Sequence, residues 1–276
     1  MGKSVGLLNY RNGHGQKKWR LGTTSCVYEC PLLDNVRRLA GRTEDIELIF
    51  YDNQWGSNWP NSEELAELRE LAGQYDLSYT VHIPSALGTV TCDSKWEEQN
   101  YALVGRTIDC LEELHPLAYV WHWEAERFGK LPSANVEGWR GALQRVAERV
   151  EKAHWVAPQR LAVETLSYPF ELIADLVCAY DYGITLDIGH LWIGGYDWEK
   201  AINKYGARTK TVHLHGIEPF SQKDHHSLIH QPAEQLQRLG TLLSSIVGEQ
   251  PRSITLEVFT EDDWLSSEHR LRQLWS

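Results

Sequence analysis

The chain has 276 residues, 42% of them hydrophobic and 24% charged, which is the composition of a folded globular protein. Its formal net charge of −11 argues against a protein that binds a nucleic-acid backbone by counterion release. No apolar run approaches the ~20 residues of a membrane span, and the polar, basic N-terminus lacks a secretory core. We therefore expect a cytoplasmic protein with no membrane or nucleic-acid partner.

Strand-like and helix-like runs alternate after residues 1–18, which we expect to form a loosely held N-terminal extension. In chain order, strands are expected at residues 20–27, 46–51, 78–83, 118–123, 160–165, 183–188, 211–216 and 253–259. Helices are expected at 32–40, from Asn61 or Ser62 onward, and at 96–114, 136–153, 169–179, 198–205, 232–247 and 267–275.

This alternation predicts an α/β fold with eight strand–helix units. Because the composition does not change along the chain, we expect residues 19–276 to form a single (β/α)8 TIM barrel. The alternative is a doubly wound open sheet, which would normally have a Gly-rich phosphate-binding turn after its first strand. The sequence Gly22-Thr23-Thr24-Ser25 does not have that pattern.

Imidazoles and carboxylates recur at or just after the carboxyl ends of the predicted strands, which meet at one face of a barrel. They are Glu47, His82, His122, Glu164, Asp187, His190, His213, Asp224, His226 and Glu257. Such groups are costly to bury unless they are paired or bind a metal. The mixed donors favour zinc, manganese or iron(II) over magnesium. There are more donors than one ion takes, so we expect two to three divalent ions, an arrangement suited to phosphoryl displacement.

The order of these residues resembles a known ligand set. His82, His122, Glu164, Asp187-x-x-His190, His213, Asp224-x-His226 and Glu257 resemble the trinuclear zinc set of the endonuclease IV family, within the xylose-isomerase-like barrel superfamily. The motifs GTTS (22–25), DIEL (45–48), YTVHIP (79–84), DIGHL (187–191), HLHG (213–216), DH-x-SL (224–228) and LEVF (256–259) look like those of the cobamide-remodelling phosphodiesterases. That resemblance implies hydrolysis of a phosphoester in the nucleotide loop of a corrinoid, the expected partner.

The resemblance also implies a role for each residue. One ion would be held by His82, His122 and Glu164, a second by Glu164, Asp187, His213 and Glu257, and a third by His190, Asp224 and His226. Zinc or manganese is expected, and Glu164 or Glu257 would orient the attacking water. Five further residues are expected to contact substrate: Trp55, Trp59, Trp192, His215 and His225.

Two other functions are compatible with the sequence. A sugar or polyol isomerase or epimerase would need one divalent ion, held by Glu164, Asp187, His213 and Glu257, with the two glutamates as acid–base pair. An abasic-site endonuclease is a weaker alternative, because the chain is acidic and has no basic run outside the N-terminal extension.

Overall fold

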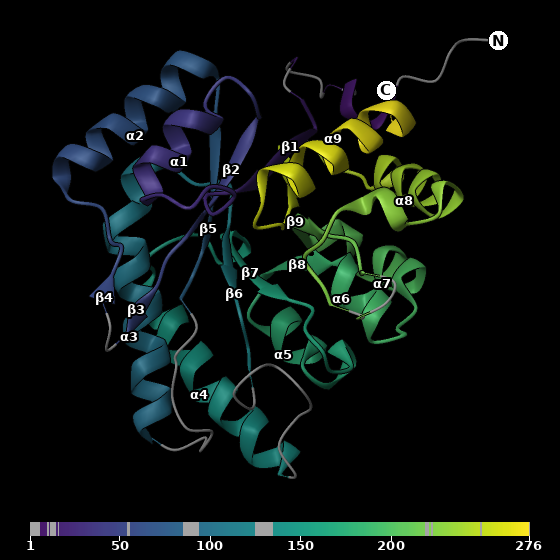
Figure 1. Cartoon of the computed structure of the whole chain (residues 1–276). Helices are drawn as coiled ribbons and strands as arrows, with labels where there is room; N and C mark the ends of the chain where they lie inside the picture. The colour runs from purple at the N-terminus through teal and green to yellow at the C-terminus, as the bar shows by residue number, and fades with distance from the viewer. Residues whose placement is uncertain are drawn as a thin grey trace.

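The protein is described here by a computed structural model that covers residues 6–9, 11, 15, 17–53, 56–84, 94–124, 135–218, 221, 223–248 and 250–275. Eight parallel strands close into a barrel in the order β1-β10-β9-β8-β7-β6-β5-β2, and helices surround it (Figure 1). The predicted (β/α)8 barrel is therefore confirmed. The barrel strands are β1 (Trp19–Thr24), β2 (Asp45–Ile49), β5 (Ser78–His82), β6 (Tyr119–Trp121), β7 (Leu161–Glu164), β8 (Gly183–Asp187), β9 (Thr209–Leu214) and β10 (Arg252–Leu256).

The α-helices of the described residues alternate with these strands. They are α1 (Leu32–Leu39), α2 (Ser62–Tyr75), α3 (Ser94–Leu111), α4 (Val136–Ala153), α5 (Ala174–Ala179), α6 (Ile188–Ile193), α7 (Trp198–Tyr205), α8 (Ala233–Ser245) and α9 (Glu261–Trp275). A short hairpin, β3 (Asp52–Asn53) and β4 (Gly56–Ser57), follows β2 outside the barrel. None of the described helices combines the length and the apolar character of a membrane span.

The bounds of several elements differ from the predicted ones, and α6 was not predicted. The expected strand at 183–188 ends at Asp187, whose side chain accepts the backbone N–H of His190 at 2.7 Å and caps α6. The last helix begins at Glu261 rather than at 267, and its first turn carries Glu261, Asp262 and Asp263. Carboxylates are favourable there because the amino end of a helix carries partial positive charge.

The N-terminal segment is described only in part. Within it, the 3-10 helix η1 (Leu7–Asn9) contacts β1, α8 and α9, and Leu7 and Leu8 are buried in the core. This part of the expected extension therefore packs on the barrel. The boundary between residues 1–18 and 19–276 stays a prediction.

Side-chain alternation along the strands produces a layered barrel interior. In the layer nearer the amino ends of the strands, Thr80 donates a hydrogen bond to Asp45 at 3.0 Å, and Ser253 donates one to Thr211 at 2.6 Å. One layer higher, two residues further along the strands, the buried side chains include Glu47, His82, His213 and Thr255. The intervening apolar residues pack in the hydrophobic core. The strand period thus accounts for polar and ionisable groups inside an otherwise apolar fold.

Candidate metal centre

The predicted ligands come together where the strands end. His82, Glu164 and Asp187 are the last residues of β5, β7 and β8, and Glu257 directly follows β10. Their donor atoms form groups with separations within 4.8 Å that could hold a metal ion: His82-His122-Glu164, Glu164-Asp187-His213-Glu257, His190-His215-His225 and Glu47-His82-Glu257. The first three are called here the double-histidine group, the carboxylate group and the triple-histidine group.

The double-histidine group aims two imidazole nitrogens at one point. The Nε2 atoms of His82 and His122 lie 3.1 Å apart, and that of His122 lies 2.9 Å from Glu164 Oε2. Each Nδ1 has its own acceptor, the backbone oxygen of Ile83 at 3.1 Å for His82 and Glu124 Oε1 at 2.8 Å for His122. Burial would lower the pKa of His122, but Glu164 and Glu124 raise it well above its ordinary value, so without an ion its Nε2 carries a proton toward Glu164 and His82. A cation in place of that proton would be bound by both Nε2 atoms and by Glu164, so these residues fit a metal ion.

The carboxylate group surrounds one imidazole nitrogen with acidic oxygens. His213 Nδ1 lies 3.2 Å from Glu257 Oε2, 3.4 Å from Glu164 Oε1 and 3.9 Å from Asp187 Oδ2. These four atoms are buried and make no hydrogen bond within the described part of the chain. Concentrated buried negative charge is unfavourable unless a cation offsets it. These four atoms, which have no hydrogen-bond partner among the described residues, therefore also fit a divalent ion as its ligands.

Electrostatic coupling in the carboxylate group is strong. Burial alone would lower the pKa of His213, but Glu47, Glu257 and Glu164 raise it well above its ordinary value. Burial would raise the pKa of Glu164, but His122 and His213 lower it well below its ordinary value. Without an ion, the cluster is thus held by imidazolium–carboxylate pairs, and ion binding must displace the imidazole protons.

The triple-histidine group differs from the expected third ion site. The structure brings His190 together with His215 and His225, whereas Asp224 lies at the edge, its Oδ2 3.9 Å from the Nε2 atoms of His190 and His225. His226 belongs to no donor group formed by the described residues, and its Nδ1 lies 3.8 Å from Asp263 Oδ2.

Backbone conformation explains why His225, rather than His226, belongs to the triple-histidine group. His226 forms an antiparallel bridge with Gly216, and its neighbour His225 has a φ of 58°, in the left-handed region that few non-glycine residues adopt. The ring of His225 lies against that of His215, with centroids 4.3 Å apart. The geometry thus places His225, rather than His226, in the triple-histidine group, and the role of His226 as a ligand stays a prediction.

His215 connects the triple-histidine group to the carboxylate group. Its Nδ1 accepts the backbone N–H of His225 at 3.1 Å, and its Nε2 lies 3.4 Å from Asp187 Oδ1. Burial would lower the pKa of His215, but Asp187 raises it to about 9. Burial would raise the pKa of Asp187, but His190 and His215 lower it to about 2. A Cβ on Gly189 would lie 2.2 Å from His215 Cε1, so only glycine leaves room for this ring.

Two residues without an assigned role in the sequence analysis contact the ligands. Glu124 accepts a hydrogen bond from His122 Nδ1, and Glu47 Oε2 lies 2.8 Å from His213 Nε2. Glu124 stands two residues after His122, on the segment that follows β6. That spacing is a signal that the sequence already contained.

The tryptophans expected to line the site pack against the protein where they are described. Trp59 stacks on Phe50 at a centroid distance of 5.0 Å and lies under the guanidinium of Arg106 at 4.8 Å. Trp192 is partly buried against the core, and Trp55 lies outside the described residues. Their contact with substrate stays a prediction.

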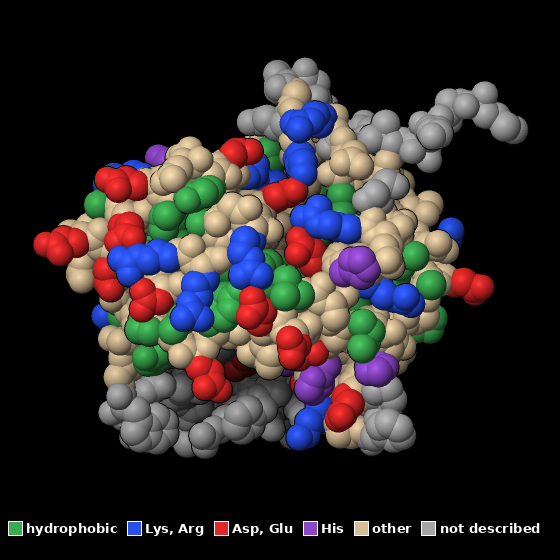
Figure 2. Space-filling view, turned by 45° about the horizontal axis from the view of Figure 1, so that its top comes forward, with side chains coloured by type: hydrophobic (Ala, Val, Ile, Leu, Met, Phe, Trp, Pro, Cys, Tyr) green, Lys and Arg blue, Asp and Glu red, His purple; other side chains and the backbone are tan. Residues whose placement is uncertain are grey.

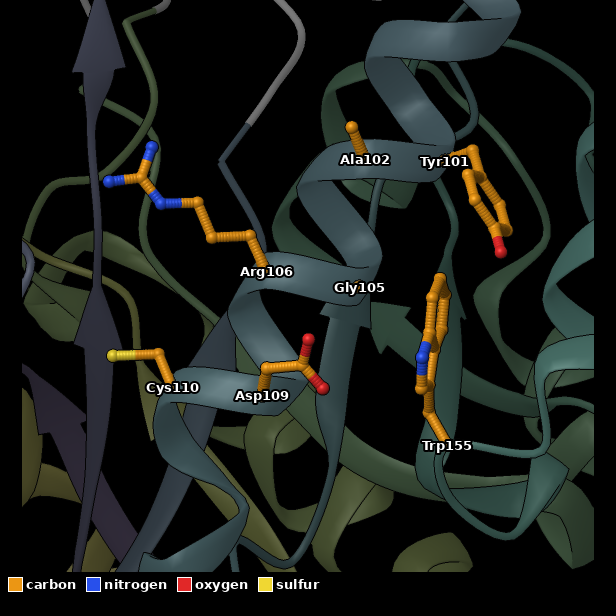
Figure 3. A pocket seen from close by; sticks show the side chains of 7 residues that line it. All are labelled: Tyr101, Ala102, Gly105, Arg106, Asp109, Cys110 and Trp155. Carbon is orange, nitrogen blue, oxygen red and sulfur yellow. The ribbon is translucent and has the colours of Figure 1, made fainter.

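Two hollows lie outside the ligand groups. One of about 520 Å³ lies on the outer side of α3, where Tyr101 and Trp155 face each other across Gly105 (Figure 3). The second, of about 240 Å³, is lined by residues of α7 and by Thr165 and Leu191, the sequence neighbours of Glu164 and His190. No ligand of the three groups lines either hollow, so the site is defined by its donors rather than by these hollows.

We expect alkaline pH to lower the thermal stability of metal-free protein but not that of zinc-loaded protein. The pKa of His215 is raised from 6.5 to about 9, so its stabilising charge is fully present below pH 6.5 and is lost as pH rises through 9. The pKa of Asp187 is lowered from 3.8 to about 2, so its contribution is lost only as pH falls below 3.8. Metal-free protein should therefore lose thermal stability between pH 6.5 and 9. Zinc-loaded protein should not, because ligation needs neutral imidazole.

Thermal unfolding of both forms at several pH values measures this difference. The His215→Gln variant is the control, because it should reduce the alkaline loss of the metal-free form to the part contributed by His122 and His213, whose pKa values are also raised. Parallel pH profiles for the two forms would contradict the expectation.

The fold and the ligand groups together define a (β/α)8 barrel with histidine and carboxylate groups that could hold divalent metal ions. Residues 42–272 match the family described as xylose isomerase-like TIM barrel, so the chain belongs to that family. This match confirms the predicted superfamily, whereas the narrower resemblance to cobamide-remodelling phosphodiesterases stays a prediction. No curated protein matches the chain at a significant level.

Several solved structures are similar to the chain over nearly their whole length. A D-tagatose 3-epimerase-like protein has 17% identity and a TM-score of 0.63, over 92% of this chain and 96% of that one. A 3-keto-D-glucoside 4-epimerase from E. coli has 14% identity and a TM-score of 0.68, over 93% and 99%. A D-psicose 3-epimerase from Clostridium cellulolyticum has 15% identity and a TM-score of 0.65, over 93% and 90%. At these identities the similarity shows the fold alone.

Proposed function

We propose that the chain is a metal-dependent phosphodiesterase with two to three ions, zinc or manganese, at the carboxyl end of its barrel. The observation that carries this proposal is the double-histidine group, which shares Glu164 with the carboxylate group. A single-ion sugar epimerase would need only the carboxylate group. The Nε2 atoms of buried His82 and partly buried His122 meet 3.1 Å apart beside the shared glutamate, which indicates a second ion position.

The protein's own residues suit phosphoester hydrolysis. Divalent ions held by these groups would supply Lewis-acid charge that offsets the negative charge on the phosphoryl oxygens. Oxygens of Glu164 and Glu257 lie 3.4 and 3.2 Å from His213 Nδ1. Ions held by these groups would keep both carboxyls ionised, so that either could accept a hydrogen bond from an attacking water.

The substrate that we propose is a corrinoid with an appended phosphodiester. Exposed apolar side chains follow several strands at this end of the barrel: Tyr51 after β2, Ile193 at the end of α6, Ile229 after β9 and Phe259 after β10. The ring of Phe259 lies 5.1 Å from that of His225, at the edge of the triple-histidine group. Exposed apolar side chains that follow the strand ends near a polar centre would suit a broad apolar macrocycle that carries one charged group.

A sugar epimerase is the second candidate. Its support comes from the names of the structural relatives and from the carboxylate group, where Glu164 and Glu257 could act as an acid–base pair. A nuclease has less support: on the face shown in Figure 2, the described basic side chains are interspersed with acidic ones.

One assay separates these candidates. Zinc- or manganese-loaded protein is incubated with cobalamin, with D-tagatose and with duplex DNA that contains an abasic site, and the products are separated by chromatography. We expect release of a nucleoside or nucleotide fragment from cobalamin, with the sugar and the DNA unchanged. Epimerisation of D-tagatose with cobalamin intact would replace the proposal by the epimerase, and cleavage of the DNA alone would replace it by the nuclease.

A further inference from the structure

A buried carboxylate lies behind His213, on the side opposite the carboxylate group. Glu47 projects from β2 and is 0% exposed, and its Oε2 lies 2.8 Å from His213 Nε2. The same oxygen accepts a hydrogen bond from the hydroxyl of Thr255 at 3.1 Å. Thr255 lies opposite His213 where β10 pairs with β9. The barrel thus places Glu47 against one specific nitrogen of one ligand.

This contact determines which nitrogen of His213 can bind an ion. An ionised carboxylate only accepts hydrogen bonds, so its contact with Nε2 requires a proton on Nε2. A neutral imidazole has one N–H, so Nδ1 must then carry the free lone pair. Nδ1 is the atom that faces Glu257 and Glu164 at 3.2 and 3.4 Å and has no hydrogen bond within the described residues.

We propose that Glu47 is a positioning residue that holds His213 with Nδ1 toward the metal ion. The inference rests on the metal centre of the proposed function, but it does not depend on the substrate. Carboxylates in this position fix the orientation of a ligating histidine and make it a stronger donor, and their loss typically weakens metal binding by about 10- to 100-fold. Glu47 would therefore raise the affinity for the ion of the carboxylate group without being one of that group's four ligands.

The matched pair of variants is Glu47→Gln and Asp45→Asn. Asp45 lies two residues earlier on β2, is also 0% exposed, and accepts from Ser78 and Thr80 rather than from a ligand. Zinc affinity is measured by competition with a fluorescent chelator, after circular dichroism has shown that both variants fold. We expect Glu47→Gln to weaken zinc binding by about 10- to 100-fold and Asp45→Asn to leave it near the wild-type value. Unchanged affinity in Glu47→Gln, or an equal loss in Asp45→Asn, would overturn the proposal.

A second measurement needs no variant at position 47. Long-range ¹H–¹⁵N spectra of zinc-loaded wild-type protein with ¹⁵N-labelled histidine report which ring nitrogen carries the proton, and the His213 signals are assigned by their loss in His213→Gln. We expect the proton on Nε2, and a proton on Nδ1 would overturn the proposal. Because neither measurement uses turnover, failure of the phosphodiesterase assay would leave this inference standing, and failure here would leave that assay untouched.

Discussion

Replacing His122 with alanine is expected to lower phosphoester hydrolysis by about 100-fold or more and to remove one bound ion. The reason is the meeting of His122 Nε2 with His82 Nε2 at 3.1 Å and with Glu164 Oε2 at 2.9 Å. The bound ions are counted by elemental analysis of dialysed protein, and turnover is measured on the same samples. We expect two to three ions in the wild type and one fewer in the variant.

The control for this experiment is His226→Ala. The side chain of His226 is 40% exposed and lies near Asp263 rather than in a ligand group, so we expect the variant to keep nearly wild-type activity and ion content. If His122→Ala also kept its activity and its ions, the multinuclear site would be excluded and the single-ion epimerase favoured. A large loss in His226→Ala would show that the loop around residues 224–226 has another conformation in the active protein.

Substituting Gly189 with alanine is expected to dislodge His215 and remove the ion of the triple-histidine group, with a loss of stability of about 1–3 kcal/mol from overpacking. The added methyl group would lie 2.2 to 2.5 Å from three ring atoms of His215, which is fully buried. Ion content and thermal unfolding measure the two effects separately.

Gly73→Ala is the matched control for this substitution. Gly73 lies in α2 with nothing within 4 Å of an added Cβ, so alanine should stabilise the helix by about 0.5–1 kcal/mol. Full ion content and wild-type stability in Gly189→Ala would contradict the packing on which the triple-histidine group depends.

The convergence of the main ligands was predictable from the sequence because it follows from the barrel alone. Once His82, Glu164 and Asp187 are placed at strand ends, closure of the sheet brings them to one face without any knowledge of loop structure. The period of two along the strands also explains why Glu47 and His213 both lie inside the barrel.

The loop after β9 could not be predicted in this way. The choice between His225 and His226 depends on the bridge to Gly216 and on a positive φ at His225, neither of which has a sequence signature. Trp59 shows the same limit for packing, since its contacts with Phe50 and Arg106 have no signature in the sequence.

The order of the ligands along the chain also has a consequence for biogenesis. The carboxylate group takes its donors from four neighbouring strands, β7 to β10, and Glu257, directly after β10, is the last of them to be synthesised. A nascent chain still leaving the ribosome would hold His82 and Glu164 without this partner. Tight ion uptake must therefore follow synthesis through Glu257, and because the ion binds only the form in which these strands have paired, it favours that form over every incomplete one.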